Sequence, residues 1–184
     1  MPRISYTNLQ HGDVILFEKR RQRGFLPSAI RLVTGSKYTH VGVVINVGGV
    51  KLVLEQLTRR RISLLKFYYT EQENYEFLHV VRPRFGVPLF ISPEWFRDRK
   101  YGYLGLLDSL VNHSAGLIDS KWKYKPTFSG MNPKNLDCSG LVATVLNLGC
   151  ATDWVKVGYE SVVEPDDFAN HPENFDYLGE LVFS

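Results

Sequence analysis

The stretch that decides the fold is residues 39–57, THVGVVINVGGVKLVLEQL. Its first half is rich in valine and isoleucine, which favour strands. Gly48 and Gly49 can supply a turn, because glycine adopts the left-handed backbone that two-residue hairpin turns need. The sequence therefore predicts a β-hairpin in which residues 50–57 return beside residues 39–47.

Two polar side chains interrupt this apolar hairpin. His40 begins the first strand, and Glu55 is the one carboxylate of the second. With a two-residue turn, Glu55 lies diagonal to His40 on the same face, because side chains alternate along a strand. A bulge at the glycines would reverse this parity, and Gln56 would then orient the imidazole instead. A carboxylate in a buried strand needs a partner, and His40 is the first candidate.

A second informative stretch, residues 138–148, predicts a helix. Its apolar face is formed by Leu141, Val142, Val145 and Leu146, and Gly149 is a typical helix end. Cys138 then lies in the first turn, where free backbone N–H groups and the helix dipole favour the thiolate, the reactive form of cysteine. Cys150 follows the helix and lacks this setting. Most cysteines are simply small buried residues, so position makes Cys138 the candidate nucleophile.

Shorter apolar runs complete the predicted fold. They indicate strands at residues 13–17, 75–82 and 177–183, and short helices at residues 27–34 and after Pro165. Residues 84–134 differ in character, so we expect a helical and loop insertion there. These elements predict an α+β fold, with an antiparallel sheet of about five or six strands and the Cys138 helix packed against it.

The whole chain has the size and composition of one folded domain. It has 184 residues, of which 44% are hydrophobic and 22% charged, and a formal net charge of +3. Basic runs at residues 19–23 and 59–61 and an acidic run at residues 164–167 are typical of solvated faces. The alternative for the basic runs is attraction to an anionic substrate. They lack interleaved aromatic side chains, so no nucleic-acid partner is expected.

The sequence predicts neither a membrane span nor a secretion signal. No stretch approaches the roughly 18 apolar residues of a span, and the first residues lack the apolar core of a signal peptide. We therefore expect a protein that is cytoplasmic at synthesis and not inserted in a membrane. Delivery elsewhere, for example as a phage-encoded lysin, and the oligomeric state stay open. Two cysteines indicate neither a disulfide framework nor a zinc site, and no metal or cofactor is expected.

These motifs resemble those of a known group of cysteine hydrolases. Residues 137–142, DCSGLV, look like the nucleophile motif of the NlpC-type, papain-like peptidases, and residues 12–17 and 40–44 are similar to their histidine half. Here His40 precedes Cys138, the reverse of the usual order. That order resembles the circularly permuted branch of the superfamily, the YiiX-like proteins, and also the lecithin:retinol acyltransferase group.

The resemblance implies one permuted papain-like domain over residues 1–184. It also implies a Cys-His-Glu triad in which Cys138 attacks a carbonyl, His40 is the base and Glu55 orients the imidazole. Tyr101, in the segment YGYLG, would position the substrate or support the oxyanion. Amide bonds in peptidoglycan stem peptides are the implied substrate.

Two other functions stay open at this point. Permuted relatives include acyl-transfer enzymes, so an acyltransferase or lipid (thio)esterase would use the same triad on an acyl substrate. A non-catalytic binding module would keep the fold without the chemistry. The remaining histidines fit structural or exposed positions, and these are His11, His79, His113 and His171.

Overall fold

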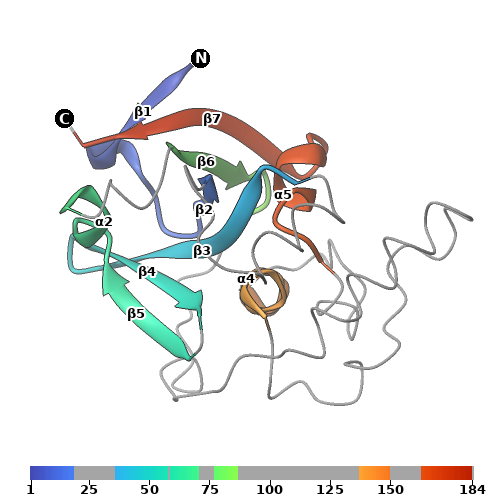
Figure 1. Ribbon diagram of the computed structural model, residues 1–184, viewed down its shortest axis with the longest axis horizontal. Coiled ribbons are helices and arrows are strands. Elements are labelled where there is room, and N and C mark those ends of the chain that lie inside the picture. Colours follow the sequence, from blue (N-terminus) through green and yellow to red (C-terminus); the bar gives the residue numbers. More distant parts are fainter. Residues whose placement is uncertain (19–35, 58, 71–76, 87–136, 150–162, 184) are drawn as a thin grey trace, which may run out of the picture.

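The computed structural model describes residues 1–18, 36–57, 59–70, 77–86, 137–149 and 163–183. In this part of the chain, strands form one mixed sheet that a few helices accompany (Figure 1). The strands are β1 (Arg3–Ser5), β2 (Val14–Glu18), β3 (Tyr38–Val47), β4 (Val50–Gln56), β5 (Arg60–Leu64), β6 (Phe77–Pro83) and β7 (Phe175–Val182). The helices are the 3-10 helix η1 (Tyr6–Asn8) and the α-helices α2 (Phe67–Thr70), α4 (Cys138–Gly149) and α5 (Asp167–Asn170). The predicted α+β class is confirmed.

The described sheet has seven strands in the order β1-β7-β6-β2-β3-β4-β5. Neighbouring strands are antiparallel except β1 and β7, which are parallel. The expected antiparallel sheet of five or six strands is therefore wrong in the number of strands and in the direction of one pair. The two strands that the sequence did not predict are β1 and β5. β1 has three residues and β5 begins within a run of arginines, so neither shows a long apolar pattern.

The central hairpin forms as predicted. Val47 pairs with Val50 across a two-glycine turn, whose φ angles of 57° and 85° are left-handed. The same register brings Gly42 opposite Glu55, so a bulge at the glycines is excluded. Gly42 has a packing reason, because a Cβ there would lie 2.6 Å from Val53 Cγ1.

A bulge at the start of β3 decides where its first side chains point. Phe17 pairs with His40 and Glu18 pairs with Tyr38, which leaves Thr39 as the extra residue. Tyr38 belongs to the core cluster that includes α4. The His40 ring instead lies 5.0 Å from the ring of Phe17, which belongs to the other cluster. Residues two apart share a face in a regular strand, so the bulge is what separates Tyr38 from His40.

The helix α4 packs on β3 and β4, and in Figure 1 it lies below β3. Its predicted apolar face is confirmed, because all four side chains are buried: Leu141, Val142, Val145 and Leu146. The opposite face of the sheet has a separate core that includes Ile15, Phe17, Val53, Leu65 and Tyr68. Packing of α4 on β3 fixes the position of Cys138 relative to the strand that carries His40.

The other predicted elements are confirmed where the structure describes them. The strands expected at residues 13–17, 75–82 and 177–183 are β2, β6 and β7. The helix expected after Pro165 is α5, which begins at Asp167; that carboxylate is buried and accepts a hydrogen bond from Glu164 N, so the acidic run is not wholly solvated. The helix at residues 27–34 and nearly all of the insertion at residues 84–134 lie outside the described residues. Within the described parts, no helix is both long and apolar enough to cross a membrane.

Candidate active site

His40 and Glu55 form a buried, hydrogen-bonded pair. His40 Nε2 lies 2.7 Å from Glu55 Oε2, and the two side chains are 9% and 0% exposed. Gly42, two residues after His40, pairs directly with Glu55, which makes the two side chains diagonal neighbours on one face. An ionised carboxylate only accepts hydrogen bonds, so Nε2 carries a proton and donates it. The predicted pairing of His40 with Glu55 is confirmed.

The other oxygen of Glu55 accepts hydrogen bonds from three further side chains. Arg61 Nε lies 2.6 Å and Ser63 Oγ 3.3 Å from Glu55 Oε1, and the Tyr68 hydroxyl donates to the same atom. Arg61 and Ser63 come from β5, in which Arg61 pairs directly with Glu55, and Tyr68 comes from α2. Arg61 is exposed, as expected of a solvated run, and it also pairs with the buried carboxylate. No sequence pattern marked Ser63 or Tyr68 as a partner of Glu55. The one available signal was that both lie near Arg61, a cation that could pair with a buried carboxylate.

This surrounding keeps Glu55 ionised. Burial acts to raise the pKa of its carboxyl group, but hydrogen bonds and charge from His40, with Tyr68 and Arg61, lower that pKa to about 2. Burial raises the pKa of the Tyr68 hydroxyl far above its ordinary value, and the negative charge of Glu55 acts in the same direction. Near neutral pH, Glu55 is therefore an anion and Tyr68 a neutral donor.

The side chain of Cys138 lies within hydrogen-bonding reach of His40. Burial acts to lower the pKa of His40, but hydrogen bonds to Cys138 and Glu55, with the charges of both, raise it to about 9. Because Nε2 is bound to Glu55, Nδ1 is the ring nitrogen left to face the thiol. The arrangement favours a proton on His40 between two groups that can carry negative charge.

Cys138 is the first residue of α4 and is buried, with 7% exposure. Asp137 precedes it and caps the helix, because its Oδ1 accepts hydrogen bonds from Gly140 N at 2.6 Å and Ser139 Oγ at 3.3 Å. The N–H groups of a first helical turn point out of the helix end, so they can stabilise negative charge that develops beside the sulfur. Asp137 is part of the quoted cysteine motif, but its capping role was not predicted.

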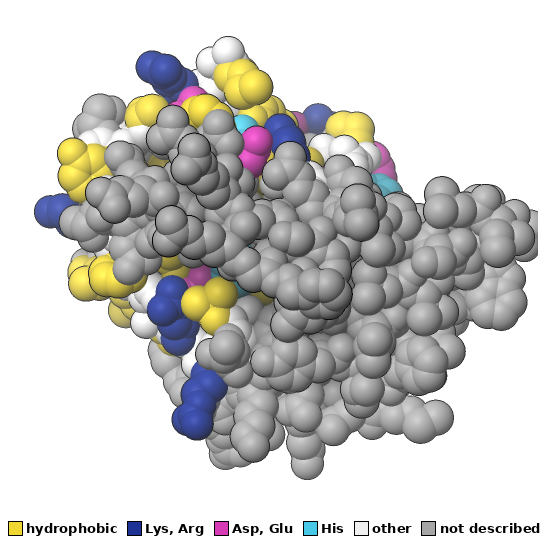
Figure 2. All heavy atoms as spheres, viewed as in Figure 1, with side chains coloured by type: hydrophobic (Ala, Val, Ile, Leu, Met, Phe, Trp, Pro, Cys, Tyr) yellow, Lys and Arg dark blue, Asp and Glu magenta, His cyan; other side chains and the backbone are white. Residues whose placement is uncertain are grey.

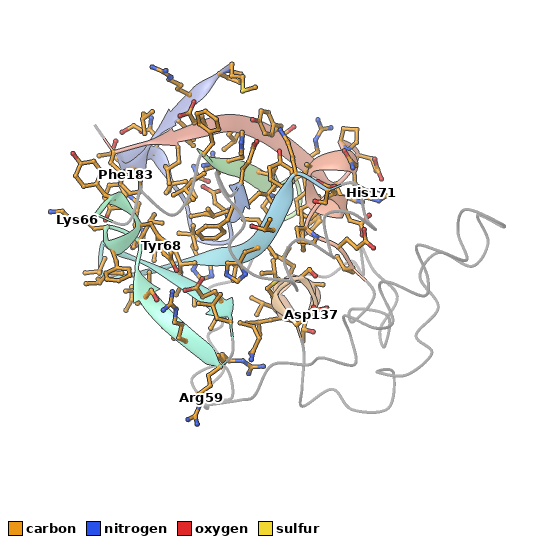
Figure 3. The ribbon with its side chains drawn as sticks, viewed as in Figure 1. Arg59, Lys66, Tyr68, Asp137, His171 and Phe183 are labelled. Atoms are coloured by element: carbon orange, nitrogen blue, oxygen red, sulfur yellow. The ribbon has the colours of Figure 1, made fainter. Side chains whose placement is uncertain are left out.

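The site lies between β4, β5 and the start of α4, close to the protein surface. Figure 3 shows Tyr68 on the sheet side of this region, Asp137 at α4 and Arg59 just before the start of β5. Arg61 is 41% exposed although its partner Glu55 is not exposed at all. Figure 2 shows basic side chains next to a small patch of acidic and histidine atoms on this face. Arg61 thus connects the buried carboxylate to the surface.

Gln56 does not face His40, as it would if the hairpin turn contained a bulge. Its neighbour Glu55 faces His40, and successive side chains of a strand point to opposite faces. Gln56 Oε1 accepts a hydrogen bond from Arg60 Nε at 3.2 Å. Glu55, and not Gln56, is therefore the residue that pairs with the imidazole.

Other residues singled out from the sequence lie elsewhere or outside the described parts. Tyr101, Cys150 and His113 are not among the described residues, so their roles stay predictions. His11 Nδ1 accepts a hydrogen bond from Asn46 N at 3.3 Å, and His171 Nδ1 lies 2.6 Å from Glu173 Oε1. These contacts fit the structural positions expected for both histidines.

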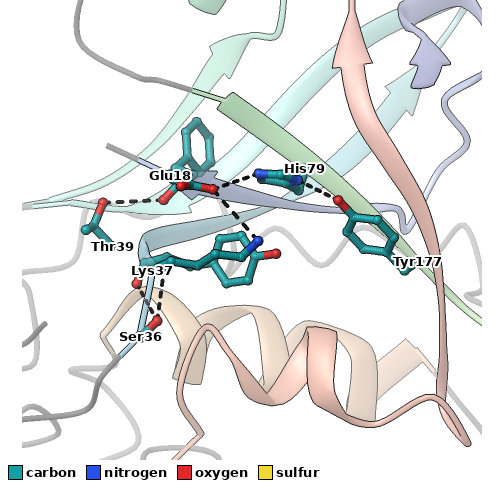
Figure 4. Close-up of polar contacts among 8 residues, drawn as sticks. Glu18, Ser36, Lys37, Thr39, His79 and Tyr177 are labelled. Carbon is teal, nitrogen blue, oxygen red and sulfur yellow. Dashed lines mark hydrogen bonds and ion pairs between the residues drawn. The ribbon is translucent and has the colours of Figure 1, made fainter. Parts of the chain in front are cut away.

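His79 belongs to a second polar network, which Figure 4 shows. Its Nε2 lies 3.0 Å from Glu18 Oε2 and its Nδ1 lies 2.7 Å from the Tyr177 hydroxyl. Burial lowers the pKa of His79 in spite of the opposing effect of Glu18. Lys37 also pairs with Glu18, at 3.9 Å, and the Tyr38 ring packs edge-on against His79. The network joins β2, β3, β6 and β7, which fits the structural role expected of His79.

The described residues do not form a metal site. In the parts of the chain that the structure covers, no group of three or more His, Cys, Asp or Glu side chains could hold a metal ion. Glu55 lies beside His40, but its second oxygen, Oε1, already accepts hydrogen bonds from the side chains of Arg61 and Tyr68.

Neither a protein-family model nor a curated protein sequence matches the chain. Among solved structures, the chain is similar to the crystal structure of the metalloprotein yiiX from Escherichia coli O157:H7, with 19% sequence identity and a TM-score of 0.44. The match covers 78% of this chain and 68% of that chain.

Proposed function

We propose that the chain is a thiol-dependent hydrolase with a permuted papain-like arrangement, in which Cys138 is the nucleophile, His40 the base and Glu55 the orienting carboxylate. One observation carries the proposal: a buried imidazole is hydrogen-bonded to a buried carboxylate and lies within hydrogen-bonding reach of the Cys138 side chain. A nucleophile, a base within hydrogen-bonding reach and a third group that orients the base define this class of site.

The geometry supports a two-step acyl transfer. The Cys138 thiolate attacks the substrate carbonyl carbon, and the carbonyl oxygen becomes an oxyanion beside the N–H groups of the first turn of α4. His40 then donates its proton to the leaving nitrogen as the carbon–nitrogen bond breaks, which leaves a thioester on Cys138. Neutral His40 takes a proton from a water molecule that attacks the thioester carbon, and the carbon–sulfur bond then breaks. The products are a carboxylic acid and the Cys138 thiolate beside protonated His40.

The substrate that we propose is an amide bond in a peptidoglycan stem peptide. This choice comes from the resemblance of residues 12–17, 40–44 and 137–142 to the NlpC-type peptidases and from the order of His40 before Cys138. In the fold, α4 packs on β3, so a cysteine that comes late in the chain meets a histidine that comes early. This packing supports the proposed permuted order, in which the histidine strand precedes the cysteine helix.

The test combines thiol labelling with substrate digestion. Iodoacetamide should label Cys138 faster than Cys150 in the folded wild type, and His40→Ala should remove this difference, because the base no longer stabilises the reactive thiolate. Purified peptidoglycan should yield new amine and carboxyl ends by mass analysis, and Cys138→Ala should abolish them while Cys150→Ala should not. Faster labelling at Cys150 would refute the nucleophile. Long-chain acyl thioesters turned over with the higher kcat/KM would refute the peptidase and leave a thiol acyltransferase.

A further inference from the structure

The two oxygens of Glu55 have different partners. Oε2 meets His40 Nε2, whereas Oε1 accepts hydrogen bonds from Arg61, Tyr68 and Ser63. A carboxylate has about four acceptor positions, two on each oxygen. Three donors therefore saturate Oε1, and Oε2 is the oxygen that stays available to the imidazole.

The three donors come from parts of the fold that fix the carboxylate in different ways. Arg61 lies directly opposite Glu55 in the β4–β5 ladder and supplies a positive charge. Tyr68 is 1% exposed and reaches the same oxygen from α2. Its ring also packs edge-on against Phe17, at 5.1 Å between centroids, and Phe17 in turn lies 5.0 Å from the His40 ring. Tyr68 therefore supports the carboxylate directly and the imidazole through Phe17.

We propose that Arg61 and Tyr68 are positioning residues of the active site, which hold Glu55 so that Oε2 receives His40 Nε2–H and Nδ1 is directed at Cys138. The proposal rests on the proposed function, because it assigns these two residues a role in the reactivity of Cys138. They act through Glu55 and do not touch the substrate. Ser63, at 3.3 Å, is the weakest of the three donors.

The charges around the imidazole give Arg61 a signature that a merely structural residue would lack. The titratable groups that meet the His40–Glu55 pair in the described residues are Cys138 from α4, Arg61 from β5 and Tyr68 from α2. Arg61 is a cation close to the imidazolium, so removing its charge makes protonation of His40 easier and raises the pKa of His40. Removing the charge of Glu55 lowers the pKa of His40. The two substitutions therefore shift one titration in opposite directions.

The experiment measures the charge on His40 with two alkylating reagents of similar size. Iodoacetate is an anion and iodoacetamide is neutral, and both react with the Cys138 thiolate. The rate constant for iodoacetate divided by that for iodoacetamide does not depend on the amount of thiolate, because both reagents react with the same thiolate. This ratio falls when His40 loses the positive charge that attracts the anionic reagent. The midpoint of this fall against pH reports the ionisation of His40.

We expect Arg61→Gln to move that midpoint to higher pH and Glu55→Gln to move it to lower pH. Arg61→Gln and Tyr68→Phe should each slow iodoacetamide at pH 7 by about tenfold, because each removes a hydrogen bond to a charged group. Tyr68→Phe keeps the ring and its packing on Phe17. In a Glu55→Gln background, Arg61→Gln should cause little further loss, since both act through one carboxylate. Arg61→Lys should restore part of the rate.

The matched control is Arg59→Gln, which removes an equal charge from the same basic run and should leave both rate and midpoint unchanged. Ser63→Ala should have the smallest effect of the three donors. If His40→Ala slows wild-type labelling but Arg61→Gln and Tyr68→Phe do not, the positioning roles are wrong and the proposed triad stands. Equal losses at Arg59 and Arg61, or a loss at Arg61 with an unmoved midpoint, would also refute the proposal. If His40→Ala itself has no effect on labelling, it is the proposed function that fails.

Discussion

At the scale of single residues, the Glu55 carboxylate joins four elements. It lies on β4 and accepts hydrogen bonds from His40 on β3, Arg61 and Ser63 on β5, and Tyr68 on α2. A buried charge is costly to the fold unless it is fully paired, and here both oxygens are paired. The contacts that surround the His40–Glu55 pair therefore also hold β5 and α2 on the central hairpin.

The stability of the protein should report the ionisation of Glu55. Its pKa is lower in the fold than in the unfolded chain, so its contribution is present above about pH 4.5 and is lost as the pH falls through about 2. A fall in pKa from 4.5 to about 2 corresponds to about 3 kcal/mol. The difference in unfolding free energy between wild type and Glu55→Gln, measured with urea at several pH values, should narrow over this window.

The control for this measurement is Glu173→Gln, which removes an exposed carboxylate with 62% exposure. Its difference from wild type should stay small at every pH, because exposed ion pairs contribute little. A Glu55→Gln curve that runs parallel to the wild type from pH 5 to pH 2 would contradict the pairing.

His40 should titrate at the opposite end of the pH range. Its pKa is raised to about 9, so the imidazolium and the stability that it contributes are fully present below about 6.5 and are lost as the pH rises through about 9. The ratio of iodoacetate to iodoacetamide rate constants in the wild type should therefore fall with a midpoint near 9. A midpoint near the ordinary value of 6.5 would mean that Cys138 and Glu55 do not stabilise the charged ring.

At the scale of the element, Asp137 determines how α4 begins. Replacing it with alanine removes the acceptor of the Gly140 N–H and should lower the free energy of unfolding by about 1 kcal/mol. Asp137→Asn keeps a capping oxygen and should lose less than half as much. Urea denaturation of the two variants measures the cap, and iodoacetamide labelling shows whether a frayed first turn also slows Cys138. Equal destabilisation by both substitutions would show that charge, not capping, is what matters.

The elements differ in how far the sequence predicts them, for physical reasons. β3, β4 and α4 are buried, so their apolar periodicity is strong, and it leads directly to the His40–Glu55 pair. β5 is an outer strand of the described sheet, and it begins with arginines. A run of arginines is typical of a solvated surface, so the sequence gives no sign that a strand begins there. The partners of Glu55 were missed for this reason, because they depend on a strand pairing that no local pattern specifies.

The bulge in β3 is a second feature without a sequence signal. Thr39 is a common strand residue, and nothing in its type indicates that it is the extra residue in the β2–β3 pair. It nevertheless decides that Tyr38 and His40 point to opposite faces. Alternation of apolar and polar residues predicts strands well. Beyond a bulge, however, the same alternation assigns each side chain to the wrong face of the sheet.

At the scale of the whole molecule, the sheet joins its first described strand to its last. β1 pairs in parallel with β7, and Figure 1 places both chain ends beside these strands. Gly179 makes the contact possible: its φ is 112°, and a Cβ there would lie 2.2 Å from Pro2 O. The backbones of β1 and β7 therefore approach too closely for any side chain at this position.

Gly179→Ala should consequently destabilise the whole sheet. Strain in this backbone region costs about 1–3 kcal/mol, and the contact with Pro2 adds to it. The melting temperature should fall clearly, whereas Gly86→Ala, where a Cβ meets nothing within 4 Å, should change it little. Thermal denaturation followed by circular dichroism measures both. Equal melting temperatures for the two variants would contradict the close approach of β1 and β7.

The pairing of β1 with β7 also has a consequence for synthesis on the ribosome. The first strand leaves the ribosome early, but the strand that it pairs with is made only after the hairpin and the cysteine helix. Until β7 is made, β6 lacks the strand that pairs with one of its edges, and the apolar side chain of Ile4 lacks its place in the core. Other chains can then bind to both. A nascent chain of this protein should therefore depend on chaperones for longer than its compact central hairpin alone would require.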